Sequence, residues 1–270
     1  MLSKQELGSK TAKSGFKNEH DIVYKFNNFK NDADARNWLN ILGYEPSKVN
    51  KIFAIQIPAS LSKKFILQSG ISETKINLTK TFKKADIQIQ LNLMMDDILY
   101  RENISCKKVD AENKRGFNQI DKRSVDKYQS FWNFDDTTAY GLKLFTGAVL
   151  NDFKGKINNR LFMNELPEKY ANSIISFFTK NKFLVISDII KGRGFFAAEW
   201  MIISKISDDK TIAKYYLKNI NDIINHYAQG DVKISPKQSL NIGKITMQRK
   251  GGTPDPTSLQ FKFNPMSVIL

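Results

Sequence analysis

The sequence predicts a mixed α and β fold, and three observations support this prediction. Apolar residues follow helical spacing through most of the first 43 positions. From Asp86 the spacing changes to strict alternation, which is typical of strands with one buried face. Two more alternating segments, 240–248 and 259–263, come near the end. With 270 residues and 41% hydrophobic content, the chain is long enough for a large packed core.

Two helices are expected first. Ser14–Lys30 places apolar residues near helical spacing, with Glu19 in an early turn. The segment from Asp32 to Gly43 repeats this pattern. Asp32 or Asp34 would be its N-cap, and Gly43 would end the helix.

Two strands and a third helix are expected next. The first strand begins at Asp86 and carries one apolar face, formed by Ile87, Ile89, Leu91 and Leu93. A loop near 96–101 leads to a second strand over Asn103–Val109. The pattern over Asp121–Trp132 then predicts a return to helix.

The second half mixes helices with strands. Helical patterns cover 136–149, 165–180 and 219–227, and an apolar run covers 197–203. The final alternating segments flank a basic loop, Arg249–Pro256, and predict a terminal hairpin. We expect one domain over 1–270, with a catalytic part near 1–150 and a helical, DNA-recognition part near 151–270.

Composition indicates the partner and limits the metal chemistry. A net charge of +15 and a pI near 9.6 favour a polyanion such as nucleic acid, although AT-rich coding also raises the Lys content. The sequence shows neither a signal peptide nor a membrane-spanning run, so we expect a cytoplasmic protein with no membrane contact. One cysteine and two histidines exclude an internal disulfide and a structural zinc cluster, which leaves oxygen ligands for any metal.

A candidate nuclease centre has the spacing D-x18-S-x-K. Hydrolysis of a phosphodiester requires a metal to polarise phosphate and activate water, and a cation to stabilise developing charge. Asp86 opens one predicted strand, and Ser105 and Lys107 share a face of the next. The Cys106 carbonyl would complete a Mg²⁺ ligand set, whereas its side chain points to the opposite face and is expected to be buried. The alternative is that Asp86 caps a strand and Lys107 is merely a soluble surface residue.

The segment Asn113–Lys122 follows this centre and combines cations with amides. Lys114 and Arg115 can neutralise phosphates, while Asn118 and Gln119 can donate and accept hydrogen bonds at base edges. This predicts a DNA-contacting segment. The alternative is a solvated turn that caps a helix.

Several uncommon strings occur together along the chain. They are Leu7–Lys13, Gly15–Glu19, Lys114–Lys122, Gly192–Gly194, Ala197–Trp200, Gln248–Gly252 and Leu259–Lys262. With them, the chain resembles the type II restriction endonucleases of the HinPI type, which recognise GCGC and belong to the PD-(D/E)XK nucleases, with a more distant similarity to the MspI type. The resemblance runs nearly end to end. It implies a central mixed sheet flanked by helices and Mg²⁺-dependent cleavage of double-stranded DNA.

The resemblance also implies roles at the centre. The family's catalytic Asp falls on Asp86 and its catalytic Lys on Lys107. Between them, Ser105 stands where the HinPI pattern has Gln and the superfamily has Glu or Asp. A neutral hydroxyl is a poorer Mg²⁺ ligand, so Glu19 on the first helix is our candidate for the missing acid. Glu19 could instead simply favour the helix dipole, and Asp110 is a weaker substitute because it points to the opposite strand face.

The resemblance further implies DNA contacts. The Gln that matches Gln119 is expected to enter the duplex at the centre of the site. The C-terminal strands are expected to read the major groove, where Lys can donate to guanine. A phosphate contact or a solvated strand face is the alternative at each position. The DNA-binding candidates are Lys114, Arg115, Asn118, Gln119, Lys122, Arg193, Gln248, Arg249, Lys250, Gln260 and Lys262.

We therefore expect cleavage of GCGC after the first G, with two-base CG 5′ overhangs, in a system that includes a cognate DNA methyltransferase. A PD-(D/E)XK nuclease with another target is the first alternative. A DNA-binding protein that has lost cleavage is the second, because of Ser105. A monomer and a homodimer both remain possible.

Overall fold

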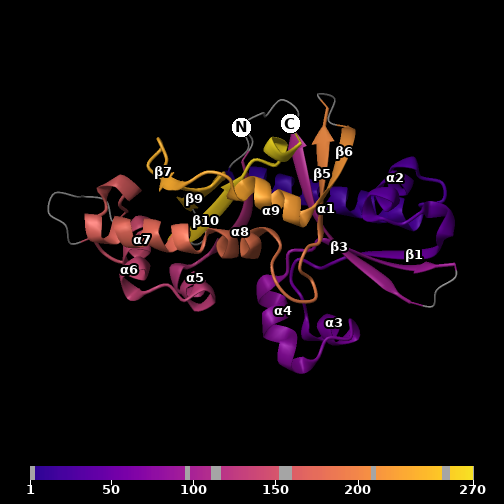
Figure 1. Ribbon diagram of the computed structural model, residues 1–270, viewed down its shortest axis with the longest axis horizontal. Coiled ribbons are helices and arrows are strands. Elements are labelled where there is room, and N and C mark those ends of the chain that lie inside the picture. The colour runs from indigo at the N-terminus through magenta and orange to yellow at the C-terminus, as the bar shows by residue number, and fades with distance from the viewer. Residues whose placement is uncertain are drawn as a thin grey trace. The chain divides into compact units, whose positions relative to one another are not determined.

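The computed structural model describes residues 4–94, 98–110, 117–151, 160–207, 211–250 and 256–269 (Figure 1). The chain forms two compact units. Unit 1 comprises 1–116, 191–222 and 265–270, and unit 2 comprises 117–190 and 223–264. The chain thus changes unit after residues 116, 190, 222 and 264.

Unit 1 contains a mixed sheet. Its strands, in chain order, are β1 (Val49–Gln56), β2 (Ile87–Leu93), β3 (Tyr100–Asp110), β5 (Trp200–Ile206) and β6 (Ile212–Asn219). Their order in the sheet is the same, β1-β2-β3-β5-β6. β3 and β5 run parallel and the other neighbours run antiparallel, so the predicted mixed sheet flanked by helices is confirmed.

Two helices pack on one face of this sheet. They are α1 (Lys4–Asn27) and α2 (Ala33–Leu42). Asp32 caps α2 by accepting from the backbone of Ala35, and Gly43 ends it with φ of 92°, as predicted. The core between helices and sheet contains Ile22, Phe26, Trp38, Ile87, Ile89, Leu91, Ile104 and Cys106. The burial predicted for the Cys106 side chain is therefore confirmed.

A smaller apolar cluster in unit 1 includes residues of α3 (Lys63–Gln68) and α4 (Ile76–Phe82). Short 3-10 turns lie at Pro46–Lys48, Glu73–Lys75 and Pro265–Val268. α4 ends at Phe82, and the next residues connect it directly to β2. Lys84 and Ala85 both donate to the carbonyl of Phe196, each at 3.0 Å, which fixes the path of the chain just before Asp86.

Unit 2 contains an antiparallel sheet and a helical layer. The sheet order is β4 (Asn118–Arg123), β10 (Leu259–Phe263), β9 (Ile245–Arg249), β8 (Leu240–Ile242) and β7 (Val232–Ile234). The helices are α5 (Val125–Trp132), α6 (Asp136–Thr146), α7 (Glu168–Lys180) and α8 (Lys182–Ile190), with a 3-10 turn at Met163–Glu165. α9 (Ile220–Ala228) begins in unit 1 and continues into unit 2. The buried Trp132 stacks on Tyr128 and donates to Asp188 at 2.9 Å.

Two expectations for unit 2 were wrong in detail. The segment from Asp121 to Arg123 belongs to a strand rather than a helix, because Ser124 caps α5 and the helix begins after it. The alternation over 240–248 is divided into β8 and β9 at Gly243, where φ is +57°. The pairing of β9 with β10 confirms the predicted terminal hairpin.

None of the helices in the described ranges combines the length and the apolar character that a membrane crossing needs.

Gly192 supplies a stability test of the unit 1 core. Its φ is +73°, and an added Cβ would lie 2.0 Å from the carbonyl oxygen of Phe82. Gly70 also has a positive φ of +80°, but open space surrounds it. Gly70→Ala should cost about 1–2 kcal/mol from backbone strain alone, whereas Gly192→Ala should cost more because the backbone must also move. Urea unfolding of both variants tests this, and equal losses would contradict the close approach at Gly192.

Candidate active site and nucleic-acid interface

Asp86 lies where the chain enters β2, and its backbone is held on both sides. Its amide donates to Ile104 at 2.9 Å, and its carbonyl accepts from Ile57 at 2.8 Å. Its Oδ2 atom accepts from the Cys106 amide at 2.7 Å and from the Ser105 hydroxyl at 3.1 Å. The carboxylate is therefore fixed against β3 through its Oδ2 atom.

Lys107 completes this cluster. Its ammonium donates to the Ser105 hydroxyl at 3.1 Å and to the Cys106 carbonyl at 2.9 Å, and it lies 3.7 Å from Oδ2 of Asp86. The Lys107 and Asp86 side chains are 19% and 24% exposed, so the pair is partly shielded from water. Ser105 is 3% exposed and joins the two charged groups. The structure thus places the three residues of the D-x18-S-x-K pattern together.

Glu19, on α1, lies in the wall of the same site. It lines a cavity of about 290 Å³ together with Asp86 and Lys83. Its Oε2 atom accepts from Gln56 at 2.6 Å. Burial raises the pKa of Glu19, and the negative charge of Asp86 raises it further. The two carboxylates are therefore close enough to repel each other, a situation that a bound cation relieves.

The oxygen atoms around this cavity fit a hard divalent cation. The carboxylates of Asp86 and Glu19 line the cavity, and the Ser105 hydroxyl and the Cys106 carbonyl belong to the adjoining cluster around Asp86 and Lys107. Oxygen donors of this kind suit Mg²⁺. Burial raises the pKa of the Cys106 thiol well above its usual value, so the carbonyl rather than a thiolate is the available ligand. Among the described residues, no group of three or more His, Cys, Asp or Glu forms a metal cluster. The side chain of Asp110 lies outside the described part.

Lys83 was not singled out from the sequence, although it lines the cavity with both carboxylates. Its ammonium lies 3.4 Å from the Ile57 carbonyl, a long hydrogen bond. Burial lowers its pKa, while Asp86 and Glu19 counteract that effect. Lys83 precedes the strand and follows no alternation, so neither periodicity nor the nuclease spacing indicated it.

The predicted reading residues of unit 2 share one face of its sheet. Gln260 on β10 is paired with Gln248 on β9 and with Lys122 on β4. Lys262 is paired with Gln119, and the Gln260 amide donates to Gln119 at 2.6 Å. The intervening residues of β10, Leu259, Phe261 and Phe263, are fully buried. The polar residues therefore occupy the face opposite the core.

A bulge places Gln119 and Lys122 on that face. Phe261 is paired with Asp121, whereas the next residue, Lys262, is paired with Gln119, so Ile120 is the extra residue of β4. Positions three apart in a regular strand point to opposite faces. The bulge reverses this relation, and both side chains join the polar face of β9 and β10.

Other predicted DNA-binding residues lie elsewhere. Asn118 is half-buried and paired with Phe263, and the Arg249 guanidinium stacks on Phe162 at 4.0 Å. Lys250 has its backbone fixed by Ser258. Lys114 and Arg115 fall outside the described residues.

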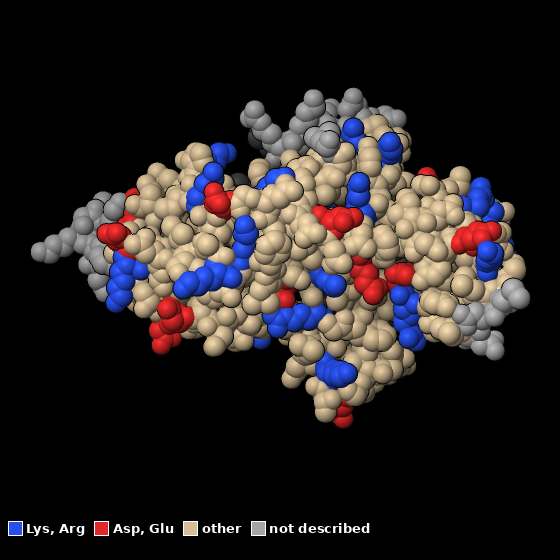
Figure 2. Space-filling view, in the orientation of Figure 1, with Lys and Arg blue, Asp and Glu red and all other residues tan. Residues whose placement is uncertain are grey.

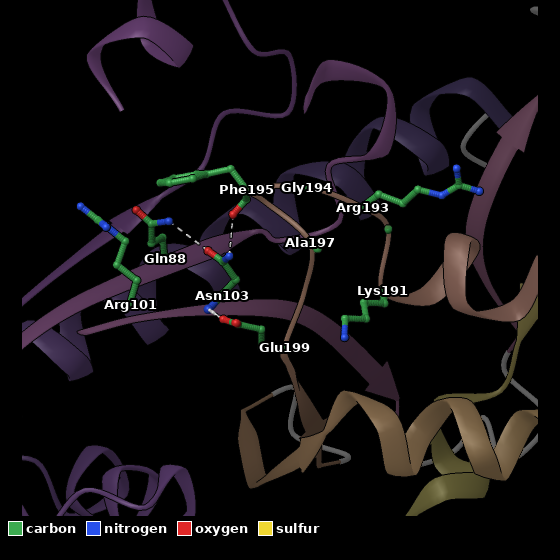
Figure 3. Close-up of a pocket in the computed structure, with 10 residues that line it drawn as sticks. Gln88, Arg101, Asn103, Lys191, Arg193, Gly194, Phe195, Ala197 and Glu199 are labelled. Carbon is green, nitrogen blue, oxygen red and sulfur yellow. Dashed lines mark hydrogen bonds between the residues drawn. The ribbon is translucent and has the colours of Figure 1, made fainter. Parts of the chain in front are cut away.

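Arg193 lies in the wall of a second cavity, of about 490 Å³, in unit 1 (Figure 3). Its guanidinium lies over the Phe82 ring at 4.5 Å, and Figure 3 shows it directed away from Asn103. The cavity floor holds the buried Gln88 and Asn103, joined by a hydrogen bond of 3.0 Å. Arg193 is thus in a tight Gly-flanked turn and does not converge on this amide pair.

Comparison with protein families decides the classification. The model of the R.HinP1I restriction endonuclease family matches residues 68–269. The chain belongs to this family. It is a restriction endonuclease, and hence a type II site-specific deoxyribonuclease. The match covers Asp86, Ser105, Lys107 and the unit 2 sheet, whereas Glu19 precedes it.

Comparison with solved structures supports the fold. The endonuclease is similar to the restriction endonuclease MspI in a crystal structure with its cognate DNA, with a TM-score of 0.55. The two sequences are 14% identical, and the match covers 97% of this chain and 93% of the other. No curated protein matches the sequence. The resemblance inferred from the sequence is confirmed at the level of family and fold.

The polar face of the endonuclease's second sheet includes two residues that the sequence analysis missed. Thr246 is paired with Lys262 and with Asn241, and its hydroxyl donates to Asn241 at 3.2 Å. Their alternation with buried Ile245 and Ile242 was the available signal. On the face shown in Figure 2, Lys and Arg are scattered among Asp and Glu, so charge does not mark an interface on this face.

The raised pKa of Glu19 predicts a pH-dependent effect in the metal-free endonuclease. A carboxyl with a raised folded pKa favours folding while protonated, and this contribution is lost as pH rises through the folded value. Glu19→Gln should therefore increase the free energy of unfolding at pH 7, with the gain disappearing below about pH 4.5. Glutamine can still accept from Gln56.

Urea unfolding in EDTA at pH 4 and pH 7 measures this difference. Glu73→Gln is the control, because Lys63 lowers the pKa of this exposed carboxyl and no gain is expected at pH 7. A Glu19→Gln variant less stable than wild type at pH 7 would show that Asp86 does not oppose the charge on Glu19.

Proposed function

We propose that this endonuclease makes Mg²⁺-dependent double-strand cuts in DNA at GCGC, after the first G, leaving two-base CG 5′ overhangs. The observation that carries the proposal is the hydrogen-bonded cluster of Asp86, Ser105 and Lys107 beside Glu19. The target and overhang rest on the resemblance to HinPI-type enzymes, with GCGC recognition in double-stranded DNA.

In the proposed mechanism, the carboxylates of Asp86 and Glu19 and the Cys106 carbonyl would hold the metal. Mg²⁺ in this position supplies polarisation of a phosphoryl oxygen and activation of water. Lys107 donates to the phosphate and stabilises the charge that develops there. An ammonium has three donors, and Ser105 and Cys106 accept two of them, which leaves one for a phosphate oxygen. Ser105 acts by holding Lys107 and Asp86 at a fixed separation.

Recognition is assigned to the polar face of the unit 2 sheet. Glutamine amides can pair with adenine and with other base edges, and lysine can donate to O6 and N7 of guanine. Gln119, Lys122, Gln248, Gln260 and Lys262 form this face. Gln119 enters the duplex at the centre of the site, as the family resemblance implies. Lys114, Arg115, Asn118, Arg193, Arg249 and Lys250 are proposed to contact the phosphate backbone.

The biological setting is proposed from the same family. A cytoplasmic endonuclease that cuts a short palindrome requires a cognate methyltransferase that protects the host DNA, without any physical contact being implied. A monomer that acts twice and a homodimer both satisfy a palindromic target. A nuclease with another target is the alternative that retains the cluster.

Plasmid digestion tests the target. We expect fragments with CG 5′ overhangs from unmethylated plasmid with Mg²⁺, and intact plasmid in EDTA or after methylation of GCGC sites. End sequencing fixes the cut position. Cuts at other sequences would reject GCGC but retain the nuclease, and specific binding without cuts would support the non-cleaving alternative.

Lys107→Ala tests the cluster. Loss of one donor to the transition state typically slows cleavage by about 10²–10³-fold, and the proposed contact predicts at least this loss with nearly unchanged DNA affinity. Lys108→Ala is the matched control, because Lys108 is adjacent and donates to Ser14 on α1 instead. Single-turnover cleavage and binding in EDTA measure both effects. Normal cutting by Lys107→Ala would remove Lys107 from the mechanism.

A further inference from the structure

We propose that Lys83 is a second catalytic cation, whose ammonium binds the phosphodiester that is cut. The inference rests on the proposed nuclease function and adds a residue to its active site. Lys83, Asp86 and Glu19 line one cavity, so a phosphate held by a metal between the carboxylates would lie beside the Lys83 side chain. Sequence spacing does not place Lys83 there. The fold does.

The backbone fixes Lys83 at the cavity. The residue follows the last turn of α4, and its backbone is extended, with φ of −58° and ψ of 128°. Lys84 and Ala85 then donate to the Phe196 carbonyl, and Asp86 donates to Ile104. Every residue from 84 to 86 is therefore anchored. These bonds fix the main chain from which the Lys83 side chain reaches the cavity.

The two lysines of the site differ in how their donors are used. Lys107 donates to Ser105 and to Cys106 and belongs to the β3 surface. For Lys83, the described residues provide one long hydrogen bond, to Ile57 at 3.4 Å. An ammonium carries three donors, so Lys83 has the capacity to bind phosphate oxygens. A half-buried ammonium with unused donors is costly unless a ligand or nearby charges compensate it.

The charges at the cavity explain why a second lysine would be useful. Two carboxylates, Asp86 and Glu19, face two ammonium groups, Lys83 and Lys107. The described residues contain no third acidic ligand at this position, which is a small ligand set for two divalent ions. Lys83 supplies a second positive charge that needs no ligands. The simpler alternative is that Lys83 only neutralises the two carboxylates.

Cleavage of a GCGC duplex under single-turnover conditions gives the first test. Lys83→Met should slow cutting by about 10²–10³-fold, as for removal of other transition-state donors. Lys83→Arg should retain more activity than Lys83→Met because it keeps the charge. Lys80→Met removes the same charge from an exposed position one turn earlier in α4 and should cut like wild type. Wild-type cutting by Lys83→Met would overturn the inference.

Binding without metal separates phosphate contact from simple neutralisation. A series of GCGC duplexes carries a single neutral methylphosphonate, at a different linkage of the site in each duplex. The affinity of wild type, Lys83→Met and Lys80→Met for each duplex is measured in EDTA. If Lys83 touches the scissile phosphate, neutralising that linkage lowers the DNA affinity of wild type and Lys80→Met several-fold. The affinity of Lys83→Met falls less. Equal losses at every linkage would overturn the inference.

The two readouts also separate this inference from the proposed function. If wild type cuts but the methylphosphonate series shows no coupling to Lys83, the nuclease stands and the lysine assignment fails. If wild type binds without cutting, the nuclease proposal fails, and coupling in EDTA still decides whether Lys83 contacts phosphate. Thermal melting checks the fold of each variant. Lys83→Gln, which retains an N–H donor without charge, replaces Lys83→Met if the latter unfolds.

Discussion

The geometry of the candidate active site depends on the hydrogen bond from the Cys106 amide to the Asp86 carboxylate. β2 begins at Ile87, and the preceding Ala85 donates to Phe196 rather than to β3. The pairing of β2 with β3 ends at Ile87 and Ile104, so the Cys106 amide lies beyond it, and the Asp86 side chain accepts its proton at 2.7 Å. A buried amide without an acceptor costs about 1–3 kcal/mol. The hydrogen bond from the Cys106 amide thus positions the Asp86 carboxylate and also satisfies the first β3 amide beyond the pairing with β2.

This arrangement explains how a serine can occupy the middle of the cluster. Ser105 has one proton, which it gives to Asp86, and it accepts from Lys107. It therefore connects an acid and a base without contributing charge. A carboxylate at this position would attract Lys107 more strongly but would add repulsion toward Asp86 and Glu19, whose pKa is already raised. A serine at this position therefore lowers the electrostatic cost of the apo site.

The second sheet meets a different requirement, which is to present polar groups without exposing its core. Strict alternation on β9 and β10 achieves this, since Met247, Phe261 and Phe263 are fully buried while the residues between them face outward. β4 achieves the same result through its bulge at Ile120. Without the extra residue, one of Gln119 and Lys122 would point toward the core. A polar surface built from three strands is more rigid than a loop carrying the same residues.

The sequence predicted those features that depend on local periodicity. Alternation predicts the apolar face of β2 and the shared face of Ser105 and Lys107. The nuclease spacing predicts that Asp86 lies near these two residues, on the strand that pairs with theirs. β1 was missed because its register shifts between Val49 and Lys51, which breaks the alternation. The bulge in β4 was also not predicted. It brings Gln119 and Lys122, which are three positions apart, to one face, and this spacing is typical of a helix rather than a strand.

Lys83 shows the limit of such reasoning most clearly. It belongs to no periodic segment, and its place in the cavity depends on backbone bonds to Phe196, more than a hundred positions later. Local patterns report which face of an element a residue occupies. They do not report which distant segments of the chain pack beside the end of that element. An active site formed at a strand end depends on those segments. The polar residues at such ends are therefore the ones for which a structure adds most to the sequence.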